Sequence, residues 1–349
     1  MTSILLLNEQ QLYQLGANDP LAYMDIIEDV FVQHATGQYV QPLKSYLRWD
    51  DNKNRMNLMP SALTAKQYNV IGVKSVTSVP SNPHVRQIPR GQSLLLLYSL
   101  ENGLPLALLA GSKISAMRTA MITTVAAKYL ANPNSRRIGL IGAGPIAAHH
   151  LLCLKAVFPS LKEASVFDVD HERTMRFCKQ VGNTLDIHIV PVKNYQSAIT
   201  DHDIVIAATN VNTAFIDGQY LSQGTFFANV GIMEAEVSVI EKSQLIVVDD
   251  INQCTQKDCP LTRALAQNIL KRDDIIEMGK LIAKQQALPT RNLTVFFNAI
   301  GMGMFDAACG NYFLKKAHEK NCGQWIKIDN GFYNEFGLLN EPSVESISE

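Results

Sequence analysis

A glycine-rich turn carries the strongest chemical signal in the sequence. Residues 137–147 read RIGLIGAGPIA, which has G-x-G-x-x-A spacing between an expected strand and an expected helix. Gly142 permits a tight turn, and Gly144 lets the backbone approach a pyrophosphate at the positive end of the following helix. The pattern predicts a dinucleotide site. We assign four residues of this turn to the cofactor: Gly142, Gly144, Pro145 and Ile146.

An acidic residue supports the same interpretation. Asp168 closes the next expected strand, 26 residues beyond Gly142. A carboxylate there can bind both ribose hydroxyls and repels a 2′-phosphate, which favours NAD over NADP. Asp170 is an alternative for this role. A fold of the same type with an empty or altered site is the competing interpretation.

Two later segments follow expected strands and are candidates for the nicotinamide half of the site. In open α/β sheets, ligands bind at the carboxyl ends of the strands. Each segment is alternatively a plain strand-to-loop junction. The candidates are Thr209 and Asn210 after one strand, and Val230 and Gly231 after another.

Strands and helices alternate through the middle of the chain, which predicts a parallel, doubly wound sheet. The expected strands are 137–141, 164–167, 187–190, 204–208, 226–230 and 245–248, and the expected helices are 114–130, 145–158 and 171–181.

The two ends of the chain have a different pattern. The first hundred residues predict an α+β unit, with a helix at 20–36, a strand at 70–76 and a hairpin of 93–99 with 104–109 that turns at Asn102-Gly103. A strand at 294–297 and a helix from about 303 to 318 are expected to pack back on this unit, ahead of a polar tail at 341–349.

Composition limits the class of protein. The chain has 349 residues, 47% of them hydrophobic and 18% charged, which predicts about two globular domains and excludes a disordered chain. The net charge of −1 gives no sign of a nucleic-acid partner. No apolar run approaches the length of a membrane span, and no secretion signal is expected. Six scattered cysteines predict free thiols in a reducing cytoplasm, rather than disulfides or a metal site.

Several short motifs run in one order along nearly the whole chain. Besides the glycine turn, they are Met59-Pro60, Gly72-Val73-Lys74, Pro80-Ser81-Asn82, Gly103-x-Pro105, Ile114 to Ala120, Ala208-Thr209 and Gly301 with Asp306. In this order they resemble the ornithine cyclodeaminase/μ-crystallin family. The resemblance implies a homodimer and an α/β fold, in which a Rossmann-type NAD-binding domain (116–292) is inserted in an α+β substrate and dimerisation domain (1–115 and 293–349).

The resemblance also assigns substrate-binding residues. Arg118 is expected to grip a substrate carboxylate with its two-pronged guanidinium, and Thr119 beside it to contact the cofactor. Lys74 lies in an apolar strand, so it needs an anion or must lose its charge, and the resemblance makes it a carboxylate partner or proton donor. Asp306 is expected near the site. Alternatively, Arg118 is a surface or ion-pairing arginine, Lys74 lies on the solvent side of an edge strand, and Asp306 only caps its helix.

Further arginines are candidates for a second carboxylate. Arg48 corresponds approximately to an arginine of the family, and Arg90 could bind a second carboxylate of the substrate. Arg86 and Lys44 compete for that role.

One departure from the cyclodeaminases favours plain amine oxidation or imine reduction. Where they carry an aspartate after Val-Gly-Gly, this chain has Met233, and the following Pro-Gly-Lys is missing. Cyclodeamination needs that carboxylate to activate the amine for ring closure. Glu234, one residue on, is a candidate general base or amine-orienting group, or else an exposed loop carboxylate.

Within the family, residues 41–48, 88–93 and 246–250 resemble the dehydrogenases of N-(2-amino-2-carboxyethyl)-L-glutamate, which make 2,3-diaminopropionate. We therefore expect NAD-dependent oxidation of that secondary amine to an imine, which hydrolyses to 2-oxoglutarate and 2,3-diaminopropionate. The alternatives are an ornithine cyclodeaminase or cyclic ketimine reductase, and a non-catalytic, μ-crystallin-like protein that binds a small ligand.

Overall fold

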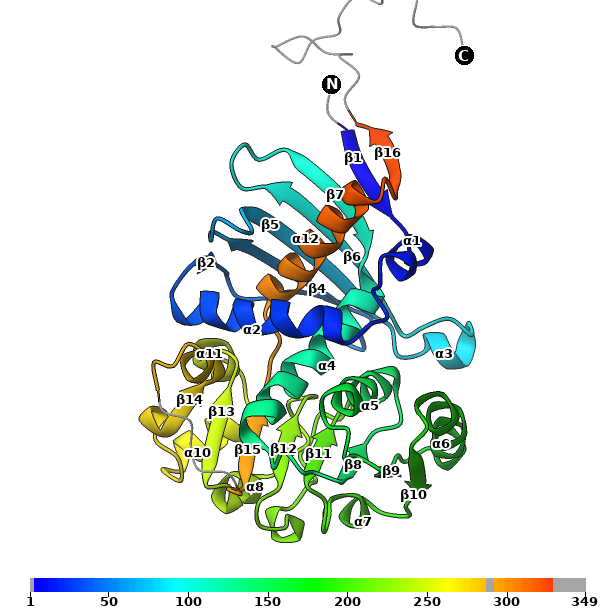
Figure 1. Ribbon diagram of the computed structural model, residues 1–349. Helices are drawn as coiled ribbons and strands as arrows, with labels where there is room; N and C mark the ends of the chain where they lie inside the picture. The colour runs from blue at the N-terminus through cyan, green and yellow to red at the C-terminus, as the bar shows by residue number, and fades with distance from the viewer. Residues whose placement is uncertain (1–2, 287–291, 329–349) are drawn as a thin grey trace, which may run out of the picture.

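The computed structural model describes residues 3–286 and 292–328, which form two sheets with helices between and around them (Figure 1). The expected tail at 341–349 lies outside these residues. The first sheet is antiparallel except where β1 pairs with β7. Its strands, in spatial order, are β16 (Gln324–Lys327), β1 (Ser3–Leu7), β7 (Pro105–Ala110), β6 (Gly91–Ser99), β5 (Val70–Ser78), β4 (Asn54–Leu63) and β2 (Tyr39–Val40), with β3 (Ser45–Trp49) also paired to β4.

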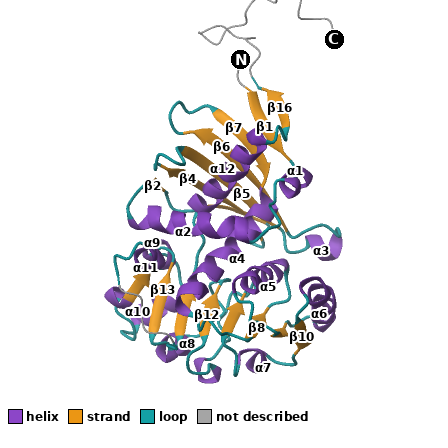
Figure 2. Cartoon of the chain, viewed as in Figure 1, coloured by secondary structure: helices purple, strands orange, loops and turns teal. Residues whose placement is uncertain are grey.

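Three helices cover one face of this sheet, which we call its inner face: α2 (Leu21–Ala35), α4 (Gly111–Leu130) and α12 (Gly303–Glu319) (Figures 1 and 2). The helix α12 approaches closely because Gly72 has no side chain, and a Cβ there would lie 2.5 Å from the Cβ of Ala307. The shorter helices α1 (Glu9–Gln14) and α3 (Asn82–Val85) complete this part.

The second sheet is entirely parallel and confirms the expected doubly wound fold. Its central strands are buried along their whole length, which is typical of a parallel sheet covered on both faces. The spatial order is β10 (His188–Pro191), β9 (Glu163–Phe167), β8 (Arg137–Ile141), β11 (Ile204–Ala207), β12 (Phe226–Asn229), β15 (Val295–Asn298), β13 (Leu245–Val248) and β14 (Ile275–Glu277).

Helices and 3₁₀ turns connect these strands. They are α5 (Pro145–Val157), α6 (His171–Leu185), α7 (Tyr195–Ile199), η1 (Gly218–Tyr220), α8 (Val237–Lys242), α9 (Ile251–Cys254), α10 (Pro260–Ala266), η2 (Arg272–Asp274) and α11 (Met278–Ile282). No helix in the described ranges is long and apolar enough to cross a bilayer.

The sequence-based prediction for one strand, at 294–297, is wrong about the sheet to which the strand belongs. The strand expected at 294–297 packs within the second sheet, as β15 between β12 and β13, and not on the first unit. A run of buried, mostly apolar residues suits a central parallel strand, but the run does not show which sheet the strand joins. The return to the first unit therefore begins only with α12, which packs on β4 and β5.

Candidate active site

A buried group of two cations and one carboxylate lies where β5, α4 and α12 meet. The Nζ atom of Lys74 lies 2.9 Å from Oδ2 of Asp306, and Nε of Arg118 lies 3.0 Å from Oδ1. Lys74 also donates to Oγ of Ser115 at 3.0 Å. All three charged side chains are at least 95% buried. The site thus has a surplus positive charge away from water, which a ligand carboxylate would neutralise.

The pKa values of these groups reflect their burial. Burial lowers the pKa of Lys74 to about 7, and the Arg118 cation adds to that effect against the opposing pull of Asp306. For Asp306, burial alone would raise the pKa, but Arg118 and Lys74 outweigh it and hold the value below its usual range. Asp306 does not cap α12, whose N-cap residue is Met302. It serves instead as the shared counterion of the two cations.

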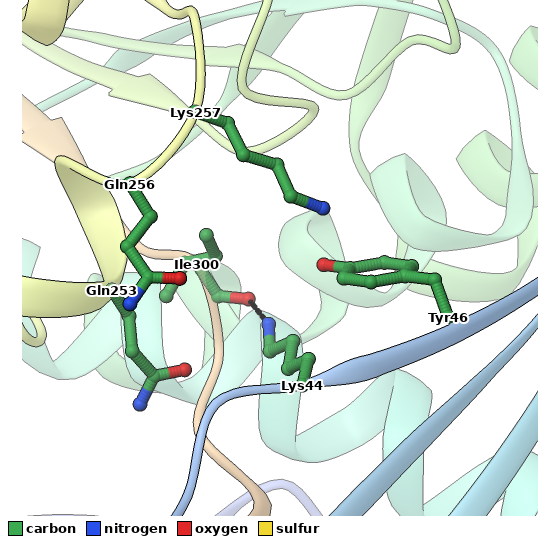
Figure 3. Close-up of a pocket in the computed structure, with 6 residues that line it drawn as sticks. All are labelled: Lys44, Tyr46, Gln253, Gln256, Lys257 and Ile300. Atoms are coloured by element: carbon green, nitrogen blue, oxygen red, sulfur yellow. Dashed lines mark hydrogen bonds between the residues drawn. The ribbon is translucent and has the colours of Figure 1, made fainter.

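Lys44 is a third cation that the structure brings to this place. Its Nζ atom donates to the carbonyl oxygen of Ile300, a contact drawn in Figure 3. Burial lowers the pKa of Lys44 to about 8, while nearby Asp249 opposes the shift and Arg118 adds to it. Sequence reasoning names Lys44 only as a competitor of other cations, because its role depends on a contact 256 residues away.

A turn at Gly301 fixes the position of Arg118. Asp249 accepts hydrogen bonds from the backbone N–H groups of Gly301 at 2.7 Å and Ile300 at 3.1 Å. Gly301 has a φ of +74°, and a Cβ there would lie 2.4 Å from Nη1 of Arg118. Only glycine therefore lets the guanidinium lie against this turn.

Figure 3 shows a pocket beside Lys44, lined also by Tyr46, Gln253, Gln256 and Lys257. Lys257 extends from the segment after α9 toward Tyr46 on β3, and its Nζ atom lies 3.4 Å from the centre of the ring. This cation–π contact joins the two parts of the molecule at the edge of the site.

The glycine turn has the shape that a pyrophosphate needs. Gly142 has a φ of +100°, and a Cβ there would lie 2.6 Å from the carbonyl oxygen of Ala208. A Cβ at Gly144 would have no neighbour within 4 Å, so the space before α5 is open. The helix α5 begins at Pro145, and no side chain caps it. The backbone N–H groups of its first turn therefore have no side-chain acceptor and can bind a phosphate. Ile146 follows in that turn. These residues fit a dinucleotide.

Asp168 lies against this turn at the end of β9. Its Oδ2 accepts from the backbone N–H of Ala143 at 2.8 Å, and its Oδ1 accepts from that of Asp170 at 3.0 Å. Asp170 caps α6 by accepting from the backbone N–H of Arg173 at 2.9 Å. Asp168 therefore contacts the glycine turn itself, whereas Asp170 caps the following helix, so Asp168 remains the expected ribose ligand.

Glu234 connects the two loops that follow β11 and β12. Its Oε1 accepts from the backbone N–H of Thr209 at 2.8 Å and from the hydroxyl at 3.0 Å. A Cβ at Gly231 would lie 1.9 Å from the same oxygen. Glu234 is fully buried, so it is not an exposed loop carboxylate, and burial raises its pKa. Its Oε2 has no hydrogen-bond partner among the described residues. Asn210 is exposed beside Thr209, and Val230 precedes Gly231.

The remaining expected residues lie outside the buried group. Thr119 follows Arg118 on α4 and donates from Oγ1 to the carbonyl oxygen of Ser115 at 2.7 Å. Arg48 is exposed on β3 over the ring of Tyr46. Arg90 is half-buried and donates from Nε to Oγ of Ser78 at 3.0 Å.

One group among the described residues has the residue types of a metal site: His34, Asp250 and Glu277, whose potential ligand atoms lie within 4.8 Å of one another. Their carboxylates already have partners. Asp250 caps α9 and lies 3.4 Å from His34, and Glu277 accepts from the backbone N–H of Ile251 and pairs with Lys280. We assign no metal to this group.

Comparison with known proteins gives a consistent result. The family model described as "Ornithine cyclodeaminase/mu-crystallin family" matches residues 15–321. N-((2S)-2-amino-2-carboxyethyl)-L-glutamate dehydrogenase from Staphylococcus aureus is 27% identical over 334 residues, which cover 93% of this chain and 98% of that protein.

Two solved structures share the fold. Thermococcus litoralis Δ1-pyrroline-2-carboxylate reductase, in complex with NADH and L-proline, has a TM-score of 0.84 at 26% identity and covers 92% of this chain and 99% of its own. An archaeal alanine dehydrogenase dimer with bound NAD has a TM-score of 0.83 at 25% identity, covering 94% and 100%.

Proposed function

This chain belongs to the ornithine cyclodeaminase/mu-crystallin family, and from that premise we propose that it oxidises N-(2-amino-2-carboxyethyl)-L-glutamate, with NAD as the cofactor. Its relatives and structural neighbours make it an NAD-dependent oxidoreductase of amino-acid-type substrates. The proposal concerns the substrate. The secondary amine would lose a hydride and a proton to become an imine, whose hydrolysis breaks the C–N bond and releases 2-oxoglutarate and L-2,3-diaminopropionate.

The observation that carries this proposal is the buried group of Lys74, Arg118 and Asp306. Two cations share one carboxylate there, with a third cation, Lys44, close by. A carboxylate of the substrate would supply the missing negative charge and accept charge-assisted hydrogen bonds. Arg118 and Lys74 would thereby hold the glutamyl α-carboxylate, and with it the neighbouring carbon, in a fixed place.

The loops after β8, β11 and β12 would hold the cofactor beside that carbon. When bound, NAD supplies the hydride acceptor. The chain's own contribution is binding and orientation. Asp168 and the glycine turn would fix the nucleotide, and Glu234 stiffens the Thr209 and Gly231 loops against each other. The burial of Lys74 and Arg118 strengthens their electrostatic effect, because water does not screen it.

Chemistry on a cyclic amino acid, by a cyclic ketimine reductase or an ornithine cyclodeaminase, is the second candidate, because the fold is also similar to that of a Δ1-pyrroline-2-carboxylate reductase. Against cyclodeamination stands Met233, a half-buried apolar residue at the position where the cyclodeaminases carry an acid. A reductase of cyclic imines would use the same carboxylate clamp, so activity measurements must separate the two.

A homodimer forms part of the proposal, and the outer face of the first sheet supports it. Leu47, Trp49, Leu58 and Leu94 lie on this face and are 60%, 41%, 36% and 50% exposed. Several large apolar residues exposed on one sheet face favour a protein–protein interface there. The archaeal alanine dehydrogenase of the same fold is a dimer.

The decisive experiment mixes the purified protein with NAD and N-(2-amino-2-carboxyethyl)-L-glutamate. We expect NADH to form together with 2-oxoglutarate and 2,3-diaminopropionate, identified by mass. Arg118→Ala and Lys74→Ala should then abolish most of the activity while NAD still binds. No NADH from a protein that binds NAD would refute this substrate, and ornithine, lysine and cyclic ketimines would be tested next.

A further inference from the structure

The inner face of the first sheet continues beyond Lys74 into a polar region. Alternate residues of a strand share a face. In the register of β4, β5 and β6, Lys74 lies between Met59 and Leu95. Two further rows of the same face follow toward the end of β5. They are Asn57, Val76 and Ser93, and then Arg55, Ser78 and Gly91, with Arg48 of β3 opposite Arg55.

Three arginines gather at this end of the face. Arg90 donates to Ser78, the strand neighbour of Arg55, and Arg48 is paired in register with Arg55. Burial lowers the pKa of Arg55, and the nearby Arg48 cation lowers it further. The pKa of Arg90 is lowered first by burial and then by the Arg55 cation. Within residues 3–286 and 292–328, none of the three forms an ion pair with a carboxylate.

Unpaired polar atoms occupy the same rows. Nε of Arg55, Oδ1 of Asn57 and Oγ of Ser93 are buried and have no hydrogen-bond partner among the described residues. Folded proteins pair nearly all buried polar atoms, so a cluster of unpaired ones on one face needs an explanation.

The uncapped start of α4 adds to the positive potential here. A Cβ at Gly111, the first residue of the helix, would lie 2.7 Å from Oγ of Ser93, so the two are adjacent. Ser112 uses its hydroxyl to accept from the backbone N–H of Ser93, and no side chain caps this 20-residue helix. The positive end of its dipole therefore lies beside the unpaired polar atoms.

We propose that Arg48, Arg55 and Arg90 form a second anion subsite, which binds a carboxylate remote from the one held at Lys74 and selects substrates with two or more carboxylates. Like-charged guanidinium groups repel, and structural arginines in proteins are ordinarily paired. Here the missing partner is the ligand. Arg48 and Arg90 are expected from the sequence, whereas Arg55 is identified only from the structure.

The spacing suits such a ligand. Successive rows on one face are two residues, or roughly 7 Å, apart along a strand. A carboxylate held at Lys74 would place the middle of the ligand along the row of Asn57 and Ser93. A second carboxylate would then lie within reach of guanidinium groups that extend from the next row. This inference rests on the proposed function in one respect: it takes the first carboxylate to be held at Lys74. It does not depend on which substrate carries that carboxylate.

The test compares two ligands that differ in a single carboxylate. Calorimetry would measure the binding of 2-oxoglutarate and of 2-oxovalerate, its five-carbon monocarboxylate counterpart, to the complex of the enzyme with NAD⁺. The wild type should bind 2-oxoglutarate ten- to a hundredfold more tightly, the range of one or two charge-assisted hydrogen bonds. Arg55→Gln should reduce this preference to less than about threefold and leave 2-oxovalerate binding unchanged.

Arg136→Gln is the matched control, because it removes the same charge from an exposed arginine just before β8. It should leave the preference intact. If Arg55→Gln does not fold, Arg90→Gln decides by the same criterion. Equal binding of the two ligands by the wild type would overturn the inference, as would equal effects of the variant and the control. A preserved preference in an enzyme that does not oxidise the proposed substrate would refute the proposed function and uphold the subsite.

Discussion

The affinity for a carboxylate ligand should fall as the pH rises, because Lys74 and Lys44 must be protonated to bind it. Burial lowers the pKa of Lys74 to about 7 and that of Lys44 to about 8 in the free enzyme. A bound carboxylate favours the charged form of each lysine, so binding takes up protons. Affinity is therefore lost as the pH rises through each pKa of the free enzyme.

The size of the effect follows from the two values. Between about pH 7 and pH 8 only Lys74 is losing its proton, and the Kd should rise up to tenfold per pH unit. Above about pH 8 both lysines lose protons, and the rise should approach a hundredfold per unit. The carboxyl groups of the ligand remain ionised throughout. The charged groups that act on the two lysines are Arg118, Asp306 and Asp249, and the Lys44 cation also acts on Lys74.

The assay measures the Kd of 2-oxoglutarate for the complex with NAD⁺ from about pH 6 to about pH 9. Lys74→Met should bind more weakly at pH 6 and show no rise until about pH 8, where Lys44 alone gives a tenfold slope. A flat profile in the wild type would refute the reasoning. So would a Lys74→Met profile that still rises from pH 7, because another group would then be responsible.

Three substitutions test the geometry of the site. Gly301→Ala places a Cβ on Nη1 of Arg118 and strains a φ of +74°, so the KM for substrate should rise about tenfold or more while NAD titration is unchanged. Asp168→Ala removes the expected ribose ligand, so the KM for NAD should rise about ten- to a hundredfold and the preference over NADP should shrink, as steady-state kinetics with both cofactors would show. Glu234→Gln keeps an oxygen that can accept from Thr209, so kcat should fall less than tenfold; a loss of about 10²–10⁴ would identify Glu234 as a general base instead.

The fold around the candidate cofactor site could be predicted because its sequence signal is local. The turn at 142–147 needs glycines at fixed spacing, and a strand before it and a helix after it can be recognised from a short window. The structure has β8 at the expected residues and α5 within one residue of the expected end. The residues after β11 and β12 likewise follow from the rule that ligands bind at the carboxyl ends of parallel strands.

The charge arrangement of the candidate substrate site could be predicted only in part. Lys74, Arg118 and Asp306 meet from three elements, and the family resemblance, not their spacing, suggested their proximity. Lys44 and Asp249 receive their roles from a turn near residue 300. Such contacts join distant parts of the chain, so no local pattern carries them.

Electrostatic complementarity argues that the ligand carries several carboxylates. Among the residues that the structure describes, the carboxylates that face Lys44, Lys74 and Arg118 are Asp249 and Asp306, which leaves one positive charge. The three arginines of the proposed subsite add further unpaired cations along the same sheet face. A monocarboxylate such as alanine or proline would neutralise the surplus charge of the buried site and leave the arginines of the subsite without a partner. A tricarboxylate would neutralise the buried site and also pair with the arginines. The net charge of the whole chain is −1, so composition conceals this concentration of positive charge, which arises only when the strands are paired in register.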